Sequence, residues 1–174
     1  MFLYSADQNY MPLACLAIAS LAEQARPVCL RVCAARRQSP AKLAPLLWDN
    51  YVEEIPSRIV YVDSDTLAVR DASGLLKREL DGNIVAAVHD SAVLSDGRVE
   101  ELCRKLDVDP ERGYFNSGLL VIDTAKWLSN DIGRKALAVF HERPEILTWN
   151  DQCALNAVLG GRWQALPFCW NKLV

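Results

Sequence analysis

The hydrophobic pattern of this chain consists of short, continuous apolar runs separated by longer stretches in which apolar residues recur at helical spacing. Continuous runs occupy residues 59–62, 84–88 and 119–122. Runs of this length that do not alternate with polar residues are typical of strands covered on both faces, as in the centre of a parallel sheet. Shorter apolar segments predict further strands at 2–4, 28–34 and 163–166.

The intervening stretches predict helices over 10–25, 40–54, 126–142 and 151–159. Pro12 falls in the first turn of the first helix, where proline is tolerated because that backbone position has no intrahelical acceptor. Strands that alternate with helices favour an α/β fold with a mostly parallel sheet flanked by helices. A length of 174 residues is enough to bury a substantial core and predicts one domain, residues 1–174.

The charge balance argues against a nucleic-acid partner. The chain has 19 Lys and Arg against 22 Asp and Glu, which gives a formal net charge of −3. Binding to a phosphate backbone requires an excess of clustered basic side chains, so we expect no nucleic acid among the partners of this protein.

Cysteine usage and the N-terminal segment indicate the compartment. The six cysteines include no C-x-x-C pair, and most lie in hydrophobic runs, so we expect reduced thiols and no disulfide framework. The first residues lack the basic cluster of a signal peptide, and the longest apolar stretch, 13–22, is too short to span a membrane. We therefore expect a cytoplasmic protein without a transmembrane segment, either free or peripheral at the inner membrane.

Polar side chains lie next to three of the predicted strands. They are Asp7 and Asn9 after the first strand, Asp63 and Asp65 after the third, and Asn116 before the fifth. In open α/β sheets, ligands bind outside the carboxyl ends of the strands. Two carboxylates one residue apart at a strand end can both reach one hard divalent cation, whose other ligands are often water and phosphate oxygens. The sequence therefore predicts a metal-assisted binding site at this edge.

Two other interpretations of the Asp63-x-Asp65 pair stay open. One is a solvated turn in which a carboxylate caps the following segment. The other is an aspartyl phosphatase of the haloacid-dehalogenase type, whose pattern has one spacer residue before Thr or Val, whereas Thr66 follows Asp65 directly. The sequence contains no G-x-G-x-x-G dinucleotide motif, no P-loop and no G-x-S-x-G nucleophile elbow.

Several segments spread over nearly the whole chain resemble, in the same order, those of glycosyltransferase family 8. They are 4–10 (YSADQNY), 60–67 (VYVDSDTL), 114–122 (YFNSGLLVI) followed by Lys126-Trp127, 149–156 (WNDQCALN) and 167–171 (PFCWN). The family comprises retaining, metal-dependent transferases of the GT-A fold that use UDP-sugars, among them bacterial lipopolysaccharide galactosyl- and glucosyltransferases and the glycogenins. The resemblance implies a GT-A-like domain, a UDP-sugar donor and a saccharide acceptor.

The resemblance also implies a nucleotide site and a metal site. The residues that would hold uracil and ribose are Ala6, Asp7, Asn9 and Tyr10. The backbone of Ser64 would lie beside the ribose. Asp63 and Asp65 would bind Mn²⁺ (or Mg²⁺), which bridges to the diphosphate.

For the transferred sugar, the resemblance implies four further residues. Asn116 and Ser117 would line the cleft of the donor sugar or acceptor. Asp151 would hydrogen-bond sugar hydroxyls, and Gln152 would lie beside the anomeric carbon on the face opposite the leaving group. An amide is a poor nucleophile, which favours front-face attack by the acceptor over a covalent intermediate. We expect Gln152 to lie beside an open cleft and to contribute little to stability; the alternative for this pair is a helix N-cap and an exposed amide.

The chain departs from the family pattern in two places. The segment 44–48 (APLLW) has no arginine where the family has one, and no H-x-x-G-x-x-K-P-W motif, which supplies a third metal ligand and a lysine on the diphosphate, follows residue 171. A catalytically weak or vestigial nucleotide-sugar-binding domain is therefore the alternative to an active hexosyltransferase.

Overall fold

The computed structural model describes residues 1–6, 11–24, 30–34, 55–95 and 97–172. Within them, six strands form one sheet in the order β2-β1-β3-β5-β4-β6. The strands are β1 (Phe2–Ala6), β2 (Leu30–Ala34), β3 (Arg58–Asp63), β4 (Val85–His89), β5 (Phe115–Asp123) and β6 (Trp163–Leu166). Strand β5 runs antiparallel to both of its neighbours, and the other pairings are parallel, so the mostly parallel sheet predicted from the sequence is confirmed.

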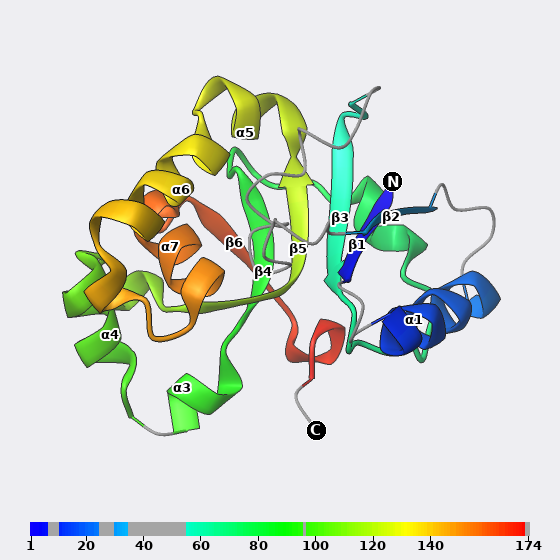
Figure 1. The fold of residues 1–174 in the computed structure, drawn as a ribbon, viewed down its shortest axis with the longest axis horizontal. Coiled ribbons are helices and arrows are strands. Elements are labelled where there is room, and N and C mark those ends of the chain that lie inside the picture. The colour runs from blue at the N-terminus through cyan, green and yellow to red at the C-terminus, as the bar shows by residue number, and fades with distance from the viewer. Residues whose placement is uncertain (7–10, 25–29, 35–54, 96, 173–174) are drawn as a thin grey trace.

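Helices flank the sheet on both faces (Figure 1). The α-helices are α1 (Met11–Gln24), α3 (Ser91–Ser95), α4 (Val99–Leu106), α5 (Thr124–Ser129), α6 (Ile132–Glu142) and α7 (Asn150–Leu159). Short 3₁₀ turns are η3 (Ser73–Lys77), η4 (Pro110–Arg112), η5 (Pro144–Ile146) and η6 (Phe168–Trp170).

The alternation of side chains along the strands divides the core into two layers. Ile59 and Tyr61 of β3 face the cluster that contains residues of α5, α6 and α7. Val60 and Val62 face the opposite cluster, which contains Ala17 of α1 and residues around η3. Because all four of these β3 side chains are at most 5% exposed, the strand is covered on both faces, as its unbroken apolar run predicts.

The predicted elements that the structure describes agree with it in the first half of the chain and differ from it in part of the second half. The single helix predicted over 126–142 is wrong, because Asn130 and Asp131 separate α5 from α6 and Asp131 takes a left-handed conformation, with φ of 60°. The helices α3 and α4 were not predicted. The helix predicted over 40–54 lies outside the described residues.

Strand β5 contains a bulge that shapes the edge of the sheet where β3 ends. Ala87 of β4 pairs with Leu120, but the next residue, Val88, pairs with Asn116, so residues 117–119 have no partner on β4. A bulge of this kind redirects the bulged residues and interrupts the ladder. Because β5 is antiparallel, its beginning lies at the edge where β3 and β4 end, and the bulge therefore occurs at this edge.

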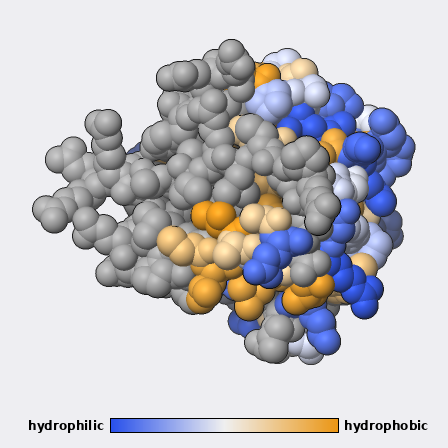
Figure 2. Space-filling view, turned by 90° about the vertical axis from the view of Figure 1, so that its right-hand side faces the viewer, coloured by the Kyte–Doolittle hydropathy of each residue, from blue (hydrophilic) through white to orange (hydrophobic). Residues whose placement is uncertain are grey.

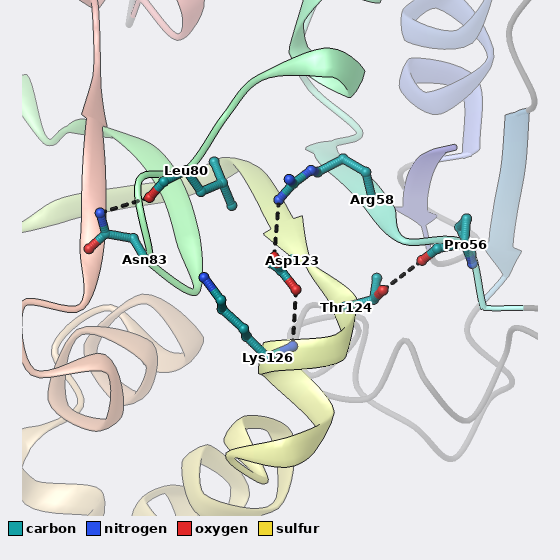
Figure 3. Close-up of polar contacts among 7 residues, drawn as sticks. All are labelled: Pro56, Arg58, Leu80, Asn83, Asp123, Thr124 and Lys126. Atoms are coloured by element: carbon teal, nitrogen blue, oxygen red, sulfur yellow. Dashed lines mark hydrogen bonds and ion pairs between the residues drawn. The ribbon is translucent and has the colours of Figure 1, made fainter.

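At the opposite end of the central strands, where β3 begins and β5 ends, polar contacts join β5 and α5 to β3 and to the residues just before it (Figure 3). Asp123 accepts a hydrogen bond from the backbone N–H of Lys126 at 3.0 Å and lies 3.8 Å from the Arg58 guanidinium. The Thr124 hydroxyl donates to the carbonyl of Pro56 at 2.6 Å. Asp123 thus caps α5 far from the end of β3.

The side of the molecule that carries α1 gathers apolar side chains (Figure 2). Leu16 of α1 is 60% exposed, and Leu67 and Val69 in the loop after β3 are 62% and 79% exposed. The Ala68 N–H donates to the Ser20 hydroxyl of α1 at 2.9 Å, which joins this loop to the helix. Among the described helices, none has the length and apolarity needed to cross a membrane.

Candidate functional site

The first part of the site is the carboxylate of Asp63, the last residue of β3. The Tyr61 hydroxyl donates to its Oδ1 at 2.8 Å. Burial raises the pKa of Asp63, the Tyr61 hydrogen bond opposes that rise, and the nearby charge of Asp65 adds to it. Ser64 lies in the turn between the two carboxylates, which the Thr66 N–H closes by donating to the Asp63 carbonyl at 3.2 Å.

The bulge of β5 brings Asn116, Ser117 and Gly118 to the same place. A methyl group added at Gly118 would lie 2.9 Å from Asn116 Oδ1 and 3.1 Å from Asp63 Oδ2. These distances show that the polar ends of Asn116 and Asp63 converge over the Gly118 Cα. Only glycine leaves the space in which they can do so.

Two amides of α7 supply hydrogen bonds to backbone groups at the start of β5, at Phe115 and at the bulged residue Ser117. Gln152 Oε1 accepts from the Ser117 N–H at 3.0 Å. The Asn156 side chain accepts from the Phe115 N–H and donates to the Phe115 carbonyl, both at 3.0 Å. Buried backbone groups need such partners, so α7 and the start of β5 depend on each other.

Asp151 precedes Gln152 and lies within electrostatic range of Asp63. Ser117 Oγ donates to its Oδ2 at 3.1 Å. Burial, followed by the charge of Asp63, raises the pKa of Asp151 to about 7, while the Ser117 hydrogen bond works against the shift. Two carboxylates from distant segments are therefore close enough to repel each other.

A third buried carboxylate, Asp90, joins the amides of this site and was not predicted. Its Oδ2 accepts from Gln152 Nε2 at 2.9 Å and from Asn116 Nδ2 at 3.2 Å. The sequence carries a usable signal, because Asp90 follows the apolar strand β4 almost as Asp63 ends β3.

Asn171 was also not among the predicted site residues. Its Nδ2 donates to Asn116 Oδ1 at 2.8 Å, and the Gly118 N–H donates to the same oxygen at 2.9 Å. The segment after η6 therefore reaches the site, although its residues are far from the others in sequence.

The structure brings most of the described candidates together. Direct hydrogen bonds join Ser117 to Asp151 and to Gln152, and Asn116 is joined to Gln152 through Asp90. Ala6 ends β1 one residue beyond Ser5, which pairs with Asp63, so the first strand also ends at this edge. The predicted nucleotide residues Asp7, Asn9 and Tyr10 lie outside the described residues.

The expectation that Gln152 is an amide beside an open cleft is wrong. Its side chain is buried, with the residue 6% exposed, and both ends of the amide have protein partners. The reason is the bulge, whose Ser117 N–H needs an acceptor that no strand provides. Gln152 therefore contributes to stability as well as to the site.

The donor chemistry of the site fits a divalent cation in part. Asp63 and Asp65 offer hard oxygen ligands, and their mutual repulsion is the kind that a bound cation offsets. In the part of the chain that the structure describes, no three or more Asp, Glu, His or Cys side chains are grouped to hold a metal. Among the described residues, Asp63 and Asp65 would be its ligands, and phosphate and water oxygens have the chemistry to join them.

Comparison with known proteins assigns the fold and the family. The model of the family described as Glycosyl transferase family 8 matches residues 36–174. The solved galactosyltransferase LgtC, in complex with donor and acceptor sugar analogs, superposes with a TM-score of 0.82 at 21% identity, covering 96% of this chain and 73% of that one. The fold is thus of the GT-A type.

Curated relatives are longer than this chain. General stress protein A of Bacillus subtilis is 35% identical over 125 residues, which cover 71% of this chain and 42% of the relative. Lipopolysaccharide 1,2-glucosyltransferase of Escherichia coli is 31% identical over 118 residues, which cover 67% of this chain and 33% of the relative. This chain therefore aligns with less than half of the length of either protein.

Proposed function

Since the chain belongs to glycosyltransferase family 8, we propose that it transfers a hexose, glucose or galactose, from a UDP-sugar to a saccharide acceptor with retention of the anomeric configuration. The observation that carries this proposal is the hydrogen-bonded network at the end of β3. The network joins Asp151 to the amides of Gln152 and Asn116 through Ser117 and Asp90. The Asp63 carboxylate, from a distant segment, lies close enough for its charge to raise the pKa of Asp151.

The carboxylates of β3 would bind the diphosphate through a cation. Asp63 and Asp65 are the residues that would hold Mn²⁺ or Mg²⁺, and the ion would neutralise charge on the departing UDP. Without a cation, two ionised aspartates would repel a nucleotide diphosphate. UDP binding should therefore depend on the metal.

The residues of α7 and the bulge would orient the transferred sugar. Asp151 would accept hydrogen bonds from sugar hydroxyls while the Ser117 hydroxyl holds its carboxylate in place. The Gln152 amide has one oxygen lone pair committed to the Ser117 N–H and its nitrogen committed to Asp90. These two hydrogen bonds argue against Gln152 as the nucleophile. They support a role in which the amide dipole stabilises charge developing at the anomeric carbon while the acceptor attacks from the face that UDP leaves.

Two relatives support a class of acceptor. Lipopolysaccharide 1,2-glucosyltransferase and lipopolysaccharide glucosyltransferase WaaO, both of Escherichia coli, are named for a lipopolysaccharide substrate. We place the acceptor of this chain in the same class, a saccharide of the bacterial envelope.

A donor panel tests the proposed function. The protein is incubated with UDP-glucose, UDP-galactose and other UDP-sugars, each with Mn²⁺ or with EDTA, and released UDP is measured with and without saccharide acceptors. We expect turnover with a UDP-hexose that needs the metal. Measurable UDP binding without turnover of any UDP-sugar would instead support a vestigial nucleotide-sugar-binding domain.

A further inference from the structure

We propose that Asp90 is a positioning residue that fixes the Gln152 amide in the orientation needed for sugar transfer. The inference rests on the transferase function proposed above. Asp90 itself makes no contact with substrate in this proposal, because protein donors occupy both oxygens of its carboxylate.

The contacts of Asp90 account for both of its oxygens. Oδ2 accepts from the side-chain amides of Gln152 and Asn116 at 2.9 and 3.2 Å. Oδ1 accepts from the Val93 N–H at 3.0 Å and thereby caps α3. The residue is 5% exposed, so little of its hydrogen-bonding capacity is left for solvent.

A carboxylate is the side chain that this position requires. Three N–H donors point at Asp90, and only a carboxylate presents two acceptor oxygens with no competing donor. An amide at this position would offer one oxygen and one NH₂ group. Whichever way it turned, its NH₂ group would face a donor, either the cap of α3 or the Gln152 amide.

The fixed orientation of Gln152 depends on this carboxylate. The Ser117 N–H can bond only to the Gln152 oxygen, and the Asp90 carboxylate can bond only to the Gln152 nitrogen. The same logic holds for Asn116, whose nitrogen meets Asp90 while its oxygen accepts from Gly118 and Asn171. Asp90 therefore orients the two amides of the site at once.

The kinetic consequence is a loss of turnover more than of substrate affinity. The Gln152 amide is proposed to act in the transition state, when charge develops at the anomeric carbon, so its misplacement lowers kcat. A displacement of about 1 Å can lower the rate about a hundredfold. We expect D90N to lower kcat by roughly ten- to a hundredfold and to change KM for the UDP-sugar less than threefold.

The test uses three variants of the full chain. D90N removes one acceptor oxygen, and Q152A removes the group that Asp90 is proposed to position. The matched control is D123N, because Asp123 lies at the end of a strand, caps a helix through Oδ1 and has a second partner on Oδ2, but lies at the opposite end of the strands from the site. We expect D123N to keep kcat within about twofold while losing stability comparable to that lost by D90N.

The double variant D90N/Q152A separates positioning from an independent role. If Asp90 acts mainly through Gln152, the loss of kcat in the double variant is at least about threefold smaller than the product of the two single losses, because the effects of two coupled residues do not add; a remaining difference from Q152A reports the orientation of Asn116. Additive losses, or a change confined to KM for the acceptor, would overturn the proposal and indicate direct contact with substrate.

A spectroscopic readout keeps the inference separate from the proposed function. The side-chain NH₂ signals of Gln152, assigned by their loss in Q152A, should exchange slowly with solvent in the wild-type protein and in D123N, and at least tenfold faster in D90N. Unchanged exchange in D90N would overturn the positioning role. Slow exchange in a protein that turns over no UDP-sugar would refute the proposed function and leave the Asp90–Gln152 contact intact.

Discussion

Replacing Asn156 by alanine tests whether α7 and the start of β5 depend on each other as the structure indicates. Asn156 is 2% exposed and makes three hydrogen bonds, two with the backbone of Phe115 and one with the Gln152 carbonyl at 2.9 Å. The ladder with β3 reaches Leu119 and no further toward the start of β5. Asn156 thus supplies the bonds that a neighbouring strand would have made at Phe115.

The expected cost of the substitution follows from those bonds. Each hydrogen bond contributes about 1 kcal/mol net, and a buried backbone group left without a partner costs about 1–3 kcal/mol. We therefore expect N156A to lower the free energy of unfolding by about 3 kcal/mol, which corresponds to a fall in Tm of roughly 6–12 °C for a domain of this size.

Urea unfolding followed by circular dichroism measures this loss. The control is N130A, because Asn130 donates through Nδ2 to the carbonyl of Lys126 at 2.9 Å from a partly exposed position. We expect N130A to lower the free energy of unfolding by less than about 1 kcal/mol. If N156A costs no more than N130A, the hydrogen bonds at Phe115 do not hold α7 against the start of β5, and the reasoning is refuted.

The remaining predictions concern the site itself. G118A should weaken metal-dependent UDP binding at least tenfold in calorimetry, because its methyl group would displace Asn116 Oδ1 and Asp63 Oδ2; unchanged binding would show that these atoms do not form the site. Q152A should lower kcat by roughly ten- to a thousandfold and the free energy of unfolding by about 2 kcal/mol, since Ser117 and Asp90 both lose a partner; full activity would refute the role of the amide. UDP should bind more tightly with Mn²⁺ than with EDTA, and D65N should remove most of that difference; equal affinities in both buffers would refute the metal site. The pKa of Asp151 is raised in the folded state from 3.8 to about 7, so in EDTA the stability that its bound proton provides should be lost as pH rises through that range, and D151N should lack this loss in thermal melts.

The fold was largely predictable because the apolar runs are unambiguous. Continuous runs at 59–62 and 84–88 became the buried strands β3 and β4, each within one residue of the predicted bounds. The break between α5 and α6 was not predictable from periodicity, because the apolar spacing continues through Asn130 and Asp131. The left-handed conformation of Asp131 ends one helix and begins the next, and the residue types that adopt this conformation are only weakly distinguished by sequence.

The site was predictable where its residues act locally and not where they act through tertiary structure. Asp63 and Asp65 were found because they follow a strand, and the rule that found them extends to Asp90. Asn171 could not be found in this way, since its contact with Asn116 depends on the antiparallel direction of β5 and on the path of the chain after β6. The burial of Gln152 likewise follows from the bulge, which leaves no signature in the hydrophobic pattern.

The measurement that tests the central claim most directly is the anomeric configuration of the transferred hexose. The protein is incubated with UDP-glucose or UDP-galactose, a saccharide acceptor and Mg²⁺, which unlike Mn²⁺ does not broaden the spectrum, and the anomeric protons are followed by ¹H NMR. A retaining family 8 transferase produces an α-linked product from the α-linked donor, with loss of the donor signal matched by gain of the product signal. A β-linked product, or a donor signal that stays constant with either sugar, would contradict the account.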